Sequence, residues 1–327
     1  MKTFVFAIVV ALSLSVVCGL IFIPVLRKIK AKQTILKYVE THKDKNGTPT
    51  MGGLFFIIPS VLTFFIFGGG NGRIAVVSVV IGLAFMFVGL IDDYIKVILK
   101  RNEGLNAIQK ILFQVAIALV AGVFVYTNGM TLFHLPFTSE SIELGWVTIP
   151  FVSIIFIAIT NCVNLTDGLD GLAASTSCAY LGSFVVLIIL QLYKKEQMYL
   201  MIEEYEKLNL LSVCMIGGLL GFLVFNSNKA SVFMGDTGSL SLGGFLGAIS
   251  IFSANALFIP IIGIMFVVSG ISVIVQVAIF KRKKKRVFLM APIHHHFQLK
   301  GYGESRIAFN YSLITAISGI LVLLPYL

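Results

Sequence analysis

The stretch RIAVVSVVIGLAFMFVGLIDDYIKV, residues 73–97, joins an apolar run of membrane-spanning length to two adjacent aspartates. A transmembrane helix needs about 20 predominantly apolar residues, because each residue adds about 1.5 Å across a hydrocarbon layer about 30 Å thick. Adjacent carboxylates are costly inside that layer unless they are solvated, paired or bound to a metal. We therefore predict a transmembrane helix over 74–91 that ends with its aspartates at the membrane surface.

The composition of the whole chain also indicates a membrane protein. Of its 327 residues, 57% are hydrophobic and 12% charged, and the mean hydropathy is +0.97. That is too little polar surface for a soluble globule of this length. The first apolar run, Phe4–Leu26, could be a signal peptide, since Lys2 precedes it and Cys18-Gly19 resembles a processing site. A basic cluster follows the run, which favours a retained transmembrane helix.

Apolar segments separated by charges or by Gly, Pro and Asn predict ten transmembrane helices. They fall at 4–26, 53–67, 74–91, 107–126, 147–160, 172–193, 208–225, 239–254, 258–280 and 307–327. Residues 253–255 and Pro260 separate the eighth helix from the ninth, and the short fifth helix is expected to extend towards Asn164. We predict an all-α integral membrane protein, a single polytopic domain over residues 1–327.

The basic residues are divided unevenly between the two ends of these helices. Ten crossings place both termini on one side, and 20 of the 25 lysines and arginines are assigned to the other. The positive-inside rule makes that richer side cytoplasmic, so both termini face outward. Because this topology accounts for the net charge of +10, we expect the lipid bilayer, and no nucleic acid, as the partner of these residues.

The four cysteines do not form a recognisable site in the sequence. Cys18, Cys162, Cys178 and Cys214 are scattered through apolar segments without C-x-x-C spacing. Such spacing indicates neither a zinc site nor a disulfide framework. We expect them to be packing residues.

The acidic residues are sorted between the two sides as well. All six aspartates fall on the predicted cytoplasmic side, and five of them lie at helix ends or within the motifs described below: Asp92, Asp93, Asp167, Asp170 and Asp236. The glutamates at 196–206 accompany lysines in an outer loop, as is typical of a solvated face. Solubility alone does not explain this sorting, which predicts a catalytic site at the inner membrane surface.

The motif GLIDDYIKV, residues 89–97, offers two carboxylates and a lysine. Mg²⁺ usually takes one or two protein carboxylates and completes its coordination with water and substrate phosphates. Asp92 and Asp93 therefore suit a diphosphate substrate, and Lys96, one helical turn later, could contact a phosphate. The alternative is an ordinary helix end with an ion pair, and the motif alone does not separate the two.

The motif NCVNLTDGLDGLA contains two further acids. Asp167 and Asp170 share one face if the segment is helical, while Gly168 and the glycine three residues later allow close approach of a ligand. Asn164 supplies a neutral donor and acceptor beside them. The alternative is a capped turn between helices, since Asn, Thr, Asp and Gly are common in turns. Two acids and two glycines before an apolar helix favour a functional role.

Two more motifs precede helices. In FMGDTGSLSLGG, residues 233–244, Asp236 can cap a helix whose N-terminal amides would favour a phosphate. Phe233 could stack on a base, although a single interfacial aromatic is more often an anchor. KNGTPTMGG, residues 45–53, is not a P-loop, because no G-K-[ST] follows its glycines, and a simple entry into a helix is the alternative.

The motif APIHHHFQLKG, residues 291–301, contains three consecutive histidines. Three adjacent side chains point in different directions, so they are unlikely as joint ligands of one metal. One histidine could face a site while its neighbours hold the loop, acting as a cation for a phosphate or as a neutral base. A basic loop on anionic lipid explains Lys281–Arg286 well and the histidines poorly.

These motifs together resemble the polyprenyl-phosphate N-acetylhexosamine-1-phosphate transferase superfamily, and most closely its phospho-N-acetylmuramoyl-pentapeptide transferase family. The resemblance covers nearly the whole chain in order. It rests on GTPTMGG (47–53), GLIDDYIK (89–96), NLTDGLDGLA (164–173), FMGDTGSL (233–240) and APIHHHFQLKG (291–301). The histidine motif separates this family from relatives that use GlcNAc-1-phosphate.

The resemblance implies a ten-helix enzyme of the bacterial inner membrane. It would transfer phospho-MurNAc-pentapeptide from UDP-MurNAc-pentapeptide to undecaprenyl phosphate, with Mg²⁺, to give lipid I and UMP for peptidoglycan synthesis. A direct attack by the lipid phosphate and a two-step route through a covalent aspartyl intermediate are both chemically open. The oligomeric state is open too, with a homodimer as one alternative.

The resemblance also implies roles for individual residues. Asp236 would bind the metal, Asp92 and Asp93 would form an essential pair with Asp92 as the base, and His294 would be the important histidine. The other residues implied at the substrate are Lys45, Thr50, Lys96, Lys110, Asn164, Asp167, Gly168, Asp170, Phe233, His295 and His296.

The sequence departs from the family pattern at two places. Ser269 stands where the family often has a glutamate, and residues 310–312 replace an arginine and aromatics. Two other functions stay as alternatives: a GlcNAc-1-phosphate transferase of the same superfamily and a polytopic transporter. A transporter would place ionisable residues near the bilayer midplane, whereas here they gather at one side.

Overall fold

The computed structural model describes residues 2–28, 47–98, 104–138, 140–194 and 201–327. Its α-helices are α1 (Lys2–Lys28), α2 (Gly53–Ile66), α3 (Arg73–Ile98), α4 (Ala107–Thr127), α5 (Thr148–Thr166), α6 (Leu172–Lys194), α7 (Ile202–Asn226), α8 (Gly235–Phe252), α9 (Ile259–Ile262), α10 (Ile264–Lys283), α11 (Ile293–Leu299) and α12 (Glu304–Leu323). Shorter elements are the 3-10 turns η2 (Gly69–Asn71), η3 (Gly145–Val147), η5 (Ala256–Phe258) and η6 (Leu324–Tyr326), and the strands β1 (Leu132–His134) and β2 (Ser141–Glu143).

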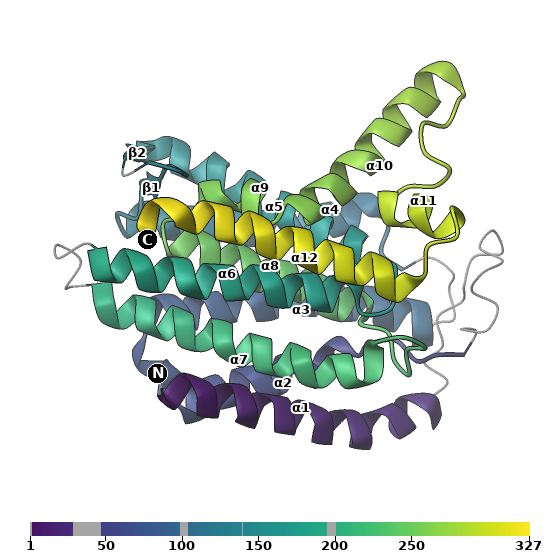
Figure 1. Ribbon diagram of the computed structural model, residues 1–327, viewed down its shortest axis with the longest axis horizontal. Helices are drawn as coiled ribbons and strands as arrows, with labels where there is room; N and C mark the ends of the chain where they lie inside the picture. The colour runs from purple at the N-terminus through teal and green to yellow at the C-terminus, as the bar shows by residue number, and fades with distance from the viewer. Residues whose placement is uncertain (1, 29–46, 99–103, 139, 195–200) are drawn as a thin grey trace.

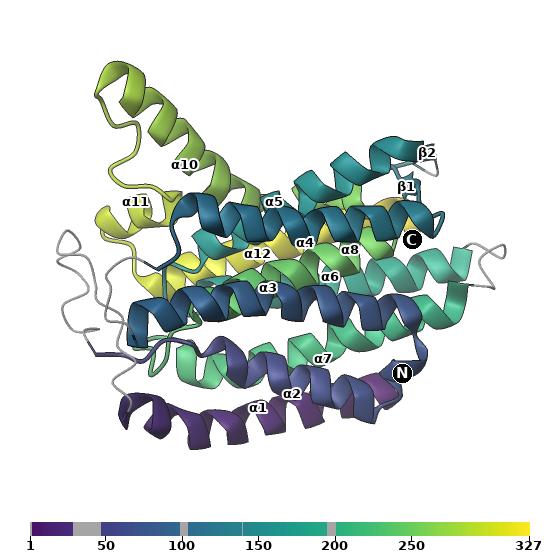
Figure 2. The same ribbon diagram turned by 180° about the vertical axis from the view of Figure 1, so that it is seen from behind.

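The long helices lie side by side in a bundle (Figure 1). Both chain termini lie at one end of the bundle, and the short helix α11 lies at the other (Figures 1 and 2). The helix α10 is the exception to the parallel arrangement, because it leans away from the bundle and projects beyond it (Figure 2).

Eight helical segments in the described part of the chain are long and apolar enough to cross a membrane. They contain α1, α3, α4, α5, α6, α7, α10 and α12. This confirms the prediction of a mostly helical, multi-pass membrane protein.

The other two predicted spans correspond to α2 and α8. The helix α2 has only 14 residues. The helix α8 contains several glycines and serines, and every residue from Thr237 to Phe252 is buried. It packs against α3 on one side and α5 on another. A helix that is surrounded by protein does not need a lipid-facing apolar surface, so α8 is the centre of the bundle.

The predicted boundaries around α8 and α5 are confirmed, with one addition. The helix α8 ends at Phe252, Ala254 has a positive φ of 60°, and Pro260 lies in the first turn of α9. The segment predicted as one helix over 258–280 is divided at Gly263 into α9 and α10. The helix α5 continues to Thr166, as expected from the polar end of its sequence.

A small antiparallel hairpin departs from the all-α prediction. The strands β1 and β2 pair over three residues each, with Phe133 opposite Ile142. Strands this short give no alternating pattern that the sequence could show. The amide of His134 also donates a hydrogen bond of 2.9 Å to the carbonyl of Ala254. The hairpin therefore holds the turn that follows α8.

Glycines bring the backbones of α2, α3 and α8 into direct contact. A Cβ at Gly89 of α3 would overlap the backbone carbonyl of Asp236, and a Cβ at Gly53 of α2 would overlap the backbone of Gly238. Small residues allow such close approach between membrane helices. As a result, the first turn of α8 is fixed between two other helices.

We expect Gly89→Ala to lower the free energy of unfolding by about 1–3 kcal/mol, because its methyl group has no space between the two backbones. The matched control is Gly182→Ala in α6, where an added Cβ meets nothing within 4 Å. Thermal unfolding of both purified variants in detergent measures the difference. Equal unfolding temperatures for the two variants would contradict the close α3–α8 contact.

Candidate functional site

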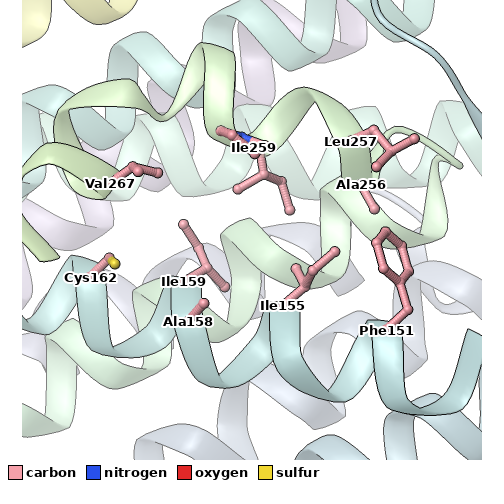
Figure 3. A pocket seen from close by; sticks show the side chains of 10 residues that line it. Phe151, Ile155, Ala158, Ile159, Cys162, Ala256, Leu257, Ile259 and Val267 are labelled. Atoms are coloured by element: carbon pink, nitrogen blue, oxygen red, sulfur yellow. The ribbon is translucent and has the colours of Figure 1, made fainter. Parts of the chain in front are cut away.

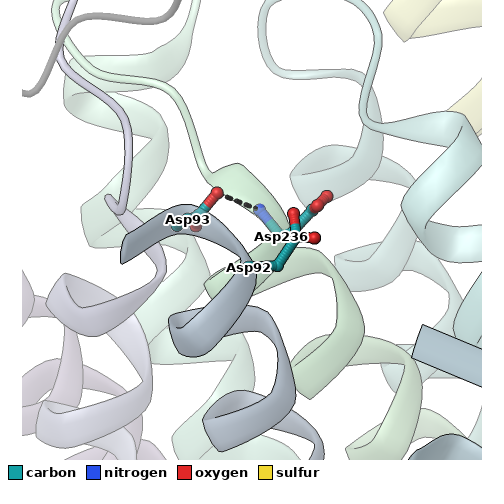
Figure 4. A group of neighbouring side chains, drawn as sticks. All are labelled: Asp92, Asp93 and Asp236. Carbon is teal, nitrogen blue, oxygen red and sulfur yellow. Dashed lines mark hydrogen bonds between the residues drawn. The ribbon is translucent and has the colours of Figure 1, made fainter. Parts of the chain in front are cut away.

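Three aspartates form the centre of the candidate site. Asp92 and Asp93 lie near the C-terminal end of α3, which is predicted to be its cytoplasmic end. Asp236 lies in the first turn of α8 (Figure 4). Each offers one carboxylate oxygen, and these oxygens lie within 4.8 Å of one another. Among the acids, histidines and cysteines of the described residues, these three aspartates form the group that could hold a metal ion.

The carboxylate of Asp93 is engaged by the N-terminus of α8. Its Oδ2 accepts hydrogen bonds from the amide (2.9 Å) and the hydroxyl (2.6 Å) of Thr237, and its Oδ1 accepts one from the amide of Asp236 (3.2 Å, Figure 4). An acidic side chain that accepts from the first amides of a helix acts as a cap. Asp93 therefore connects α3 to α8 and sets the position of Asp236.

Two lysines connect Asp92 with Asp236. The ammonium Nζ of Lys96 lies 2.8 Å from Asp236 Oδ2 and 2.5 Å from Asp92 Oδ2. The Nζ of Lys110, at the start of α4, lies 2.8 Å from the same Asp236 oxygen and 4.0 Å from Asp92 Oδ2. Charged side chains from α3, α4 and α8 thus meet at one point. Each charge in this partly buried place has a partner of opposite sign, which offsets its desolvation.

The remaining oxygens of this pair are held by neutral donors. The amide nitrogen Nδ2 of Asn164 donates to Asp236 Oδ1 at 2.7 Å and to the hydroxyl of Ser239 at 2.7 Å. The backbone amide of Leu105 donates to Asp92 Oδ1 at 2.9 Å. Because one oxygen of each carboxylate is fixed in this way, the other oxygen of each points to the lysines.

The chain before α2 packs against the loop that leads into α8. The amide of Phe233 donates to the carbonyl of Pro49 at 2.8 Å, and the amide of Gly52 donates back to the carbonyl of Phe233 at 2.8 Å. A Cβ at Gly235, whose φ is 72°, would lie 2.6 Å from both Asp93 Oδ2 and Thr50 Oγ1. The motifs GTPTMGG and FMGDTG therefore form one structure around Asp93. Lys45 lies outside the described residues.

Asp167 and Asp170 lie in a turn between α5 and α6, not on one face of a helix. Desolvation, with smaller contributions from Asp236, Asp93 and Asp170, raises the pKa of Asp167 to about 8. At neutral pH this carboxyl group therefore holds a proton and can donate a hydrogen bond. The shared face was predicted for a helical segment, and this condition is not met, because α5 ends at Thr166.

Asp170 has the contacts of a residue that shapes loops. Its Oδ2 accepts from the amide of Ala230 at 2.9 Å, and its own amide donates to Glu304 Oε2 at 3.0 Å. The next amide, of Gly171, donates to the side chain of Asn226 at 3.0 Å, and Asn226 donates to the carbonyl of Val232 at 2.9 Å. These bonds hold the segment that carries Phe233.

The first of the three histidines is buried beside the turn that contains Asp167. His294 has no exposed surface, and a Cβ added at Gly168 would overlap its Nε2. Neither ring nitrogen has a hydrogen-bond partner among the described residues. Burial, with a smaller contribution from His295, lowers the pKa of His294 well below its usual value. The imidazole is therefore neutral at pH 7.

The other two histidines hold the loop around α11. His296 Nδ1 accepts from the amide of Leu289 at 3.1 Å, and His295 Nδ1 lies 3.1 Å from Gln298 Oε1. The rings of His294 and His295 have centroids 4.3 Å apart at an angle of 60°. The three side chains therefore have different surroundings, as three adjacent positions on a short helix require.

Sequence reasoning missed several residues that position this loop. Ser272 of α10 accepts from the amide of Ile293 at 3.0 Å, and Gln276 accepts from the amides of Val287 and Phe288 at 3.0 Å each. Each is a polar residue on an otherwise apolar helix, a signal that could have indicated a buried partner.

The two departures from the family pattern meet in space. The hydroxyl groups of Ser269 and Tyr311 lie 3.4 Å apart, and the ring of Tyr311 lies 6.3 Å from that of His294. Both are buried.

An apolar cavity of about 200 Å³ lies between α5 and the segment that contains η5, α9 and the start of α10 (Figure 3). Phe151, Ile155, Ile159 and Cys162 line it from α5 (Figure 3). Cys162 is the α5 lining residue nearest in sequence to Asn164, which donates to Asp236. The cavity can accept a hydrocarbon chain, since polar groups contribute almost nothing to its lining.

Comparison with known proteins agrees with this arrangement. The model for glycosyl transferase family 4 matches residues 75–254, and signature 1 of the phospho-N-acetylmuramoyl-pentapeptide-transferases matches residues 45–57. These segments include all three aspartates of the cluster and the chain that packs beside Asp93.

Curated relatives match over nearly their whole length. The phospho-N-acetylmuramoyl-pentapeptide-transferase of Clostridium novyi is 41% identical over 97% of this chain and 95% of its own. That of Desulfitobacterium hafniense is 41% identical over 98% and 97%, and that of Bacillus subtilis 38% identical over 97% and 97%. By its motifs, its charged cluster and these similarities, the chain belongs to the phospho-N-acetylmuramoyl-pentapeptide-transferase family within glycosyl transferase family 4.

Proposed function

We propose that the protein transfers phospho-MurNAc-pentapeptide from UDP-MurNAc-pentapeptide to undecaprenyl phosphate, giving lipid I and UMP for peptidoglycan synthesis. The observation that carries the proposal is the cluster of Asp92, Asp236, Lys96 and Lys110, in a chain of this family. Carboxylates and ammonium groups around one point suit a reaction between two phosphorylated substrates, because phosphoryl transfer depends mainly on positioning and charge stabilisation.

The proposed topology has ten crossings, with α2 and α8 completing the eight apolar segments, and both termini outside the cytoplasm of a bacterial inner membrane. Its support is the excess of lysine and arginine on the side opposite the termini. The charged cluster lies at helix ends and not at mid-helix, which favours an enzyme at a membrane surface over a transporter. The proposed function is compatible with a homodimer.

The residue that would hold Mg²⁺ is Asp236, through Oδ2, the oxygen that both lysines contact. Oxygen ligands and at most two protein carboxylates are what Mg²⁺ prefers when it also binds substrate phosphates. When bound, the ion would neutralise charge on the diphosphate. Asp93 is less suited as a ligand, because both of its oxygens accept hydrogen bonds from the first turn of α8.

In the proposed reaction, an oxygen of the acceptor phosphate attacks the phosphorus that is bonded to the sugar. The new phosphorus–oxygen bond forms as the bond to the bridging oxygen breaks, and UMP leaves with that electron pair. Asp92 would accept the proton of the acceptor phosphate, since its Oδ2 faces the centre of the cluster. We favour this direct route over an aspartyl intermediate, because Asp92 and Asp236 are both held in ion pairs.

The acceptor's hydrocarbon chain would lie along the apolar cavity between α5 and α9–α10 (Figure 3). The donor would approach from the side of Asn164, Asp167 and Phe233, where a protonated carboxyl, an amide and an aromatic ring are available. His294, neutral and without a partner among the described residues, could bond with the sugar phosphate. Gly168 and Asp170 would act by positioning His294 and the Phe233 loop.

The purified protein should form lipid-linked product from labelled UDP-MurNAc-pentapeptide, undecaprenyl phosphate and Mg²⁺. It should do so at least about tenfold faster than with UDP-GlcNAc, because contacts to the donor outside the diphosphate set specificity. Thin-layer separation of the labelled lipid measures both rates. Equal or faster use of UDP-GlcNAc would favour the related transferase, and a covalent phospho-enzyme formed without acceptor would exclude the direct route.

Asp236→Asn should reduce turnover by about a hundredfold to a thousandfold, because it removes one charge from the oxygens that would bind the ion. The unfolding temperature should change little, since Asn164 can still donate to the oxygen of the neutral side chain. Glu203→Gln, at the far end of the bundle, is the control for the loss of one negative charge. Substantial Mg²⁺-dependent activity in the Asp236 variant would refute the ligand assignment.

Asp92→Asn and Asp93→Asn should separate chemistry from structure. The first removes the proposed base and should lower the rate with little loss of stability. The second places an NH2 group where a carboxylate oxygen now accepts from the first turn of α8, and the lost acceptor should cost about 1–3 kcal/mol of unfolding free energy, with a smaller loss of rate. Thermal unfolding and the transfer assay on the same samples test the contrast. If the Asp93 variant were more stable than the Asp92 variant and lost more activity, Asp93 would be the base and Asp92 the structural residue.

A further inference from the structure

Lys96 and Lys110 both contact Asp236 Oδ2, the oxygen through which a cation would bind at this site. Both ammonium groups lie 2.8 Å from Asp236 Oδ2, although they come from different helices. Lys96 also lies 2.5 Å from Asp92 Oδ2. These are the two carboxylate oxygens that face the centre of the cluster.

The other carboxylate oxygens of the cluster are held by fixed donors. Asp236 Oδ1 accepts from Asn164, Asp92 Oδ1 accepts from the amide of Leu105, and both oxygens of Asp93 accept from the first turn of α8. A cation that binds Asp236 must therefore use Oδ2, the oxygen that both lysines contact. Two ammonium groups and a divalent cation on the same oxygen would repel one another strongly, because water screens like charges poorly in a partly buried site.

The lysine side chains are suited to leaving that oxygen. An ammonium group is a compact charge with three donors on a flexible stem, and it can follow a phosphate over several ångströms. Lys96 keeps more than a third of its side-chain surface exposed and Lys110 less than a fifth. Neither is enclosed in the way that Asp92 and Asp93 are.

We propose that Lys96 and Lys110 exchange partners during the catalytic cycle: they leave Asp236 when the divalent cation binds, and they transfer to phosphate oxygens of the donor. This rests on the proposed function. The cation and the lysines then compete for Asp236 Oδ2. The donor's diphosphate removes the competition, because it offers the displaced ammonium groups a new partner.

The exchange links cation affinity to the presence of a diphosphate. A cation alone must displace the lysines into solvent, whereas a cation with the diphosphate moves them from one anion to another. The two ligands therefore strengthen each other's binding by the same factor, as thermodynamic linkage requires. Permanent ion pairs that only support the fold would give the opposite result, since removing a lysine would then disturb the carboxylates and weaken cation binding.

The test uses Mn²⁺ as the probe and follows its binding to the full-length protein in detergent by electron paramagnetic resonance. We expect Lys96→Met to bind Mn²⁺ about tenfold more tightly than the unaltered protein in the absence of nucleotide, because one charged hydrogen-bonding partner no longer competes. Lys110→Met should show a gain of similar size, since its ammonium group lies at the same distance, 2.8 Å, from Asp236 Oδ2. Both variants should lose transfer activity.

The control for net charge is Lys281→Met, at the end of α10, which should change neither Mn²⁺ affinity nor activity. Added UDP provides the second measurement. It should tighten Mn²⁺ binding more in the unaltered protein than in Lys96→Met, where no ammonium group is left to transfer from this position. The free Mn²⁺ concentration in each sample is corrected for the Mn²⁺–UDP complex.

Weaker or unchanged Mn²⁺ binding in both lysine variants would overturn the exchange, while leaving the proposed function in place. Failure of the proposed metal site has a different signature. In that case Asp236→Asn would bind Mn²⁺ as well as the unaltered protein does, with or without UDP. If Lys96→Met does not fold, Lys110→Met carries the same test on its own.

Discussion

The hydrogen bonds between the Asp93 carboxylate and the first turn of α8 determine the geometry of the site. Asp93 is buried, and a buried charge is costly unless donors surround it. Two amides, one hydroxyl and the positive end of the α8 dipole supply those donors. The same contact brings the α3 backbone at Gly89 against the carbonyl of Asp236. With α3 and α8 joined in this way, Asp92 and Asp236 must face each other, and the lysines must lie between them.

The charges around Asp92 and Asp236 are arranged as two layers. Neutral or backbone donors fix the outer oxygens, and lysines on flexible side chains contact the inner oxygens. The fixed layer keeps the carboxylates oriented whatever their inner partners are. The mobile layer offers positive charge that can be redistributed at low cost, since each ammonium group only changes its anionic partner. Such an arrangement suits a site that handles two phosphorylated molecules, because positive charge can follow the phosphates.

A second set of contacts, on the side of α10–α12, places the histidine loop against the turn between α5 and α6. Ser272 and Gln276 on α10 hold the segment 287–293, and Glu304 at the start of α12 bonds both to the amide of Asp170 and to Gln298. Gly168 then lies against His294 with no space for a side chain. Polar side chains on otherwise apolar helices thus connect the two halves of the site. Burying these polar side chains costs desolvation free energy, and their hydrogen bonds to partners at helix ends offset that cost.

The sequence alone determined the membrane class, nearly all helix positions, the breaks around Ala254 and Pro260, and the gathering of aspartates at one side. These follow from run length, punctuation and charge, which act locally along the chain. The hairpin, the division at Gly263 and the central burial of α8 were decided by neighbours that no local pattern shows. Only the tertiary structure decided that Asp93 caps a helix while Asp92 faces Asp236, although the two are adjacent in sequence. Successive side chains on a helix point about 100° apart, so a distant helix, α8, gives each carboxylate its partner and with it a different task.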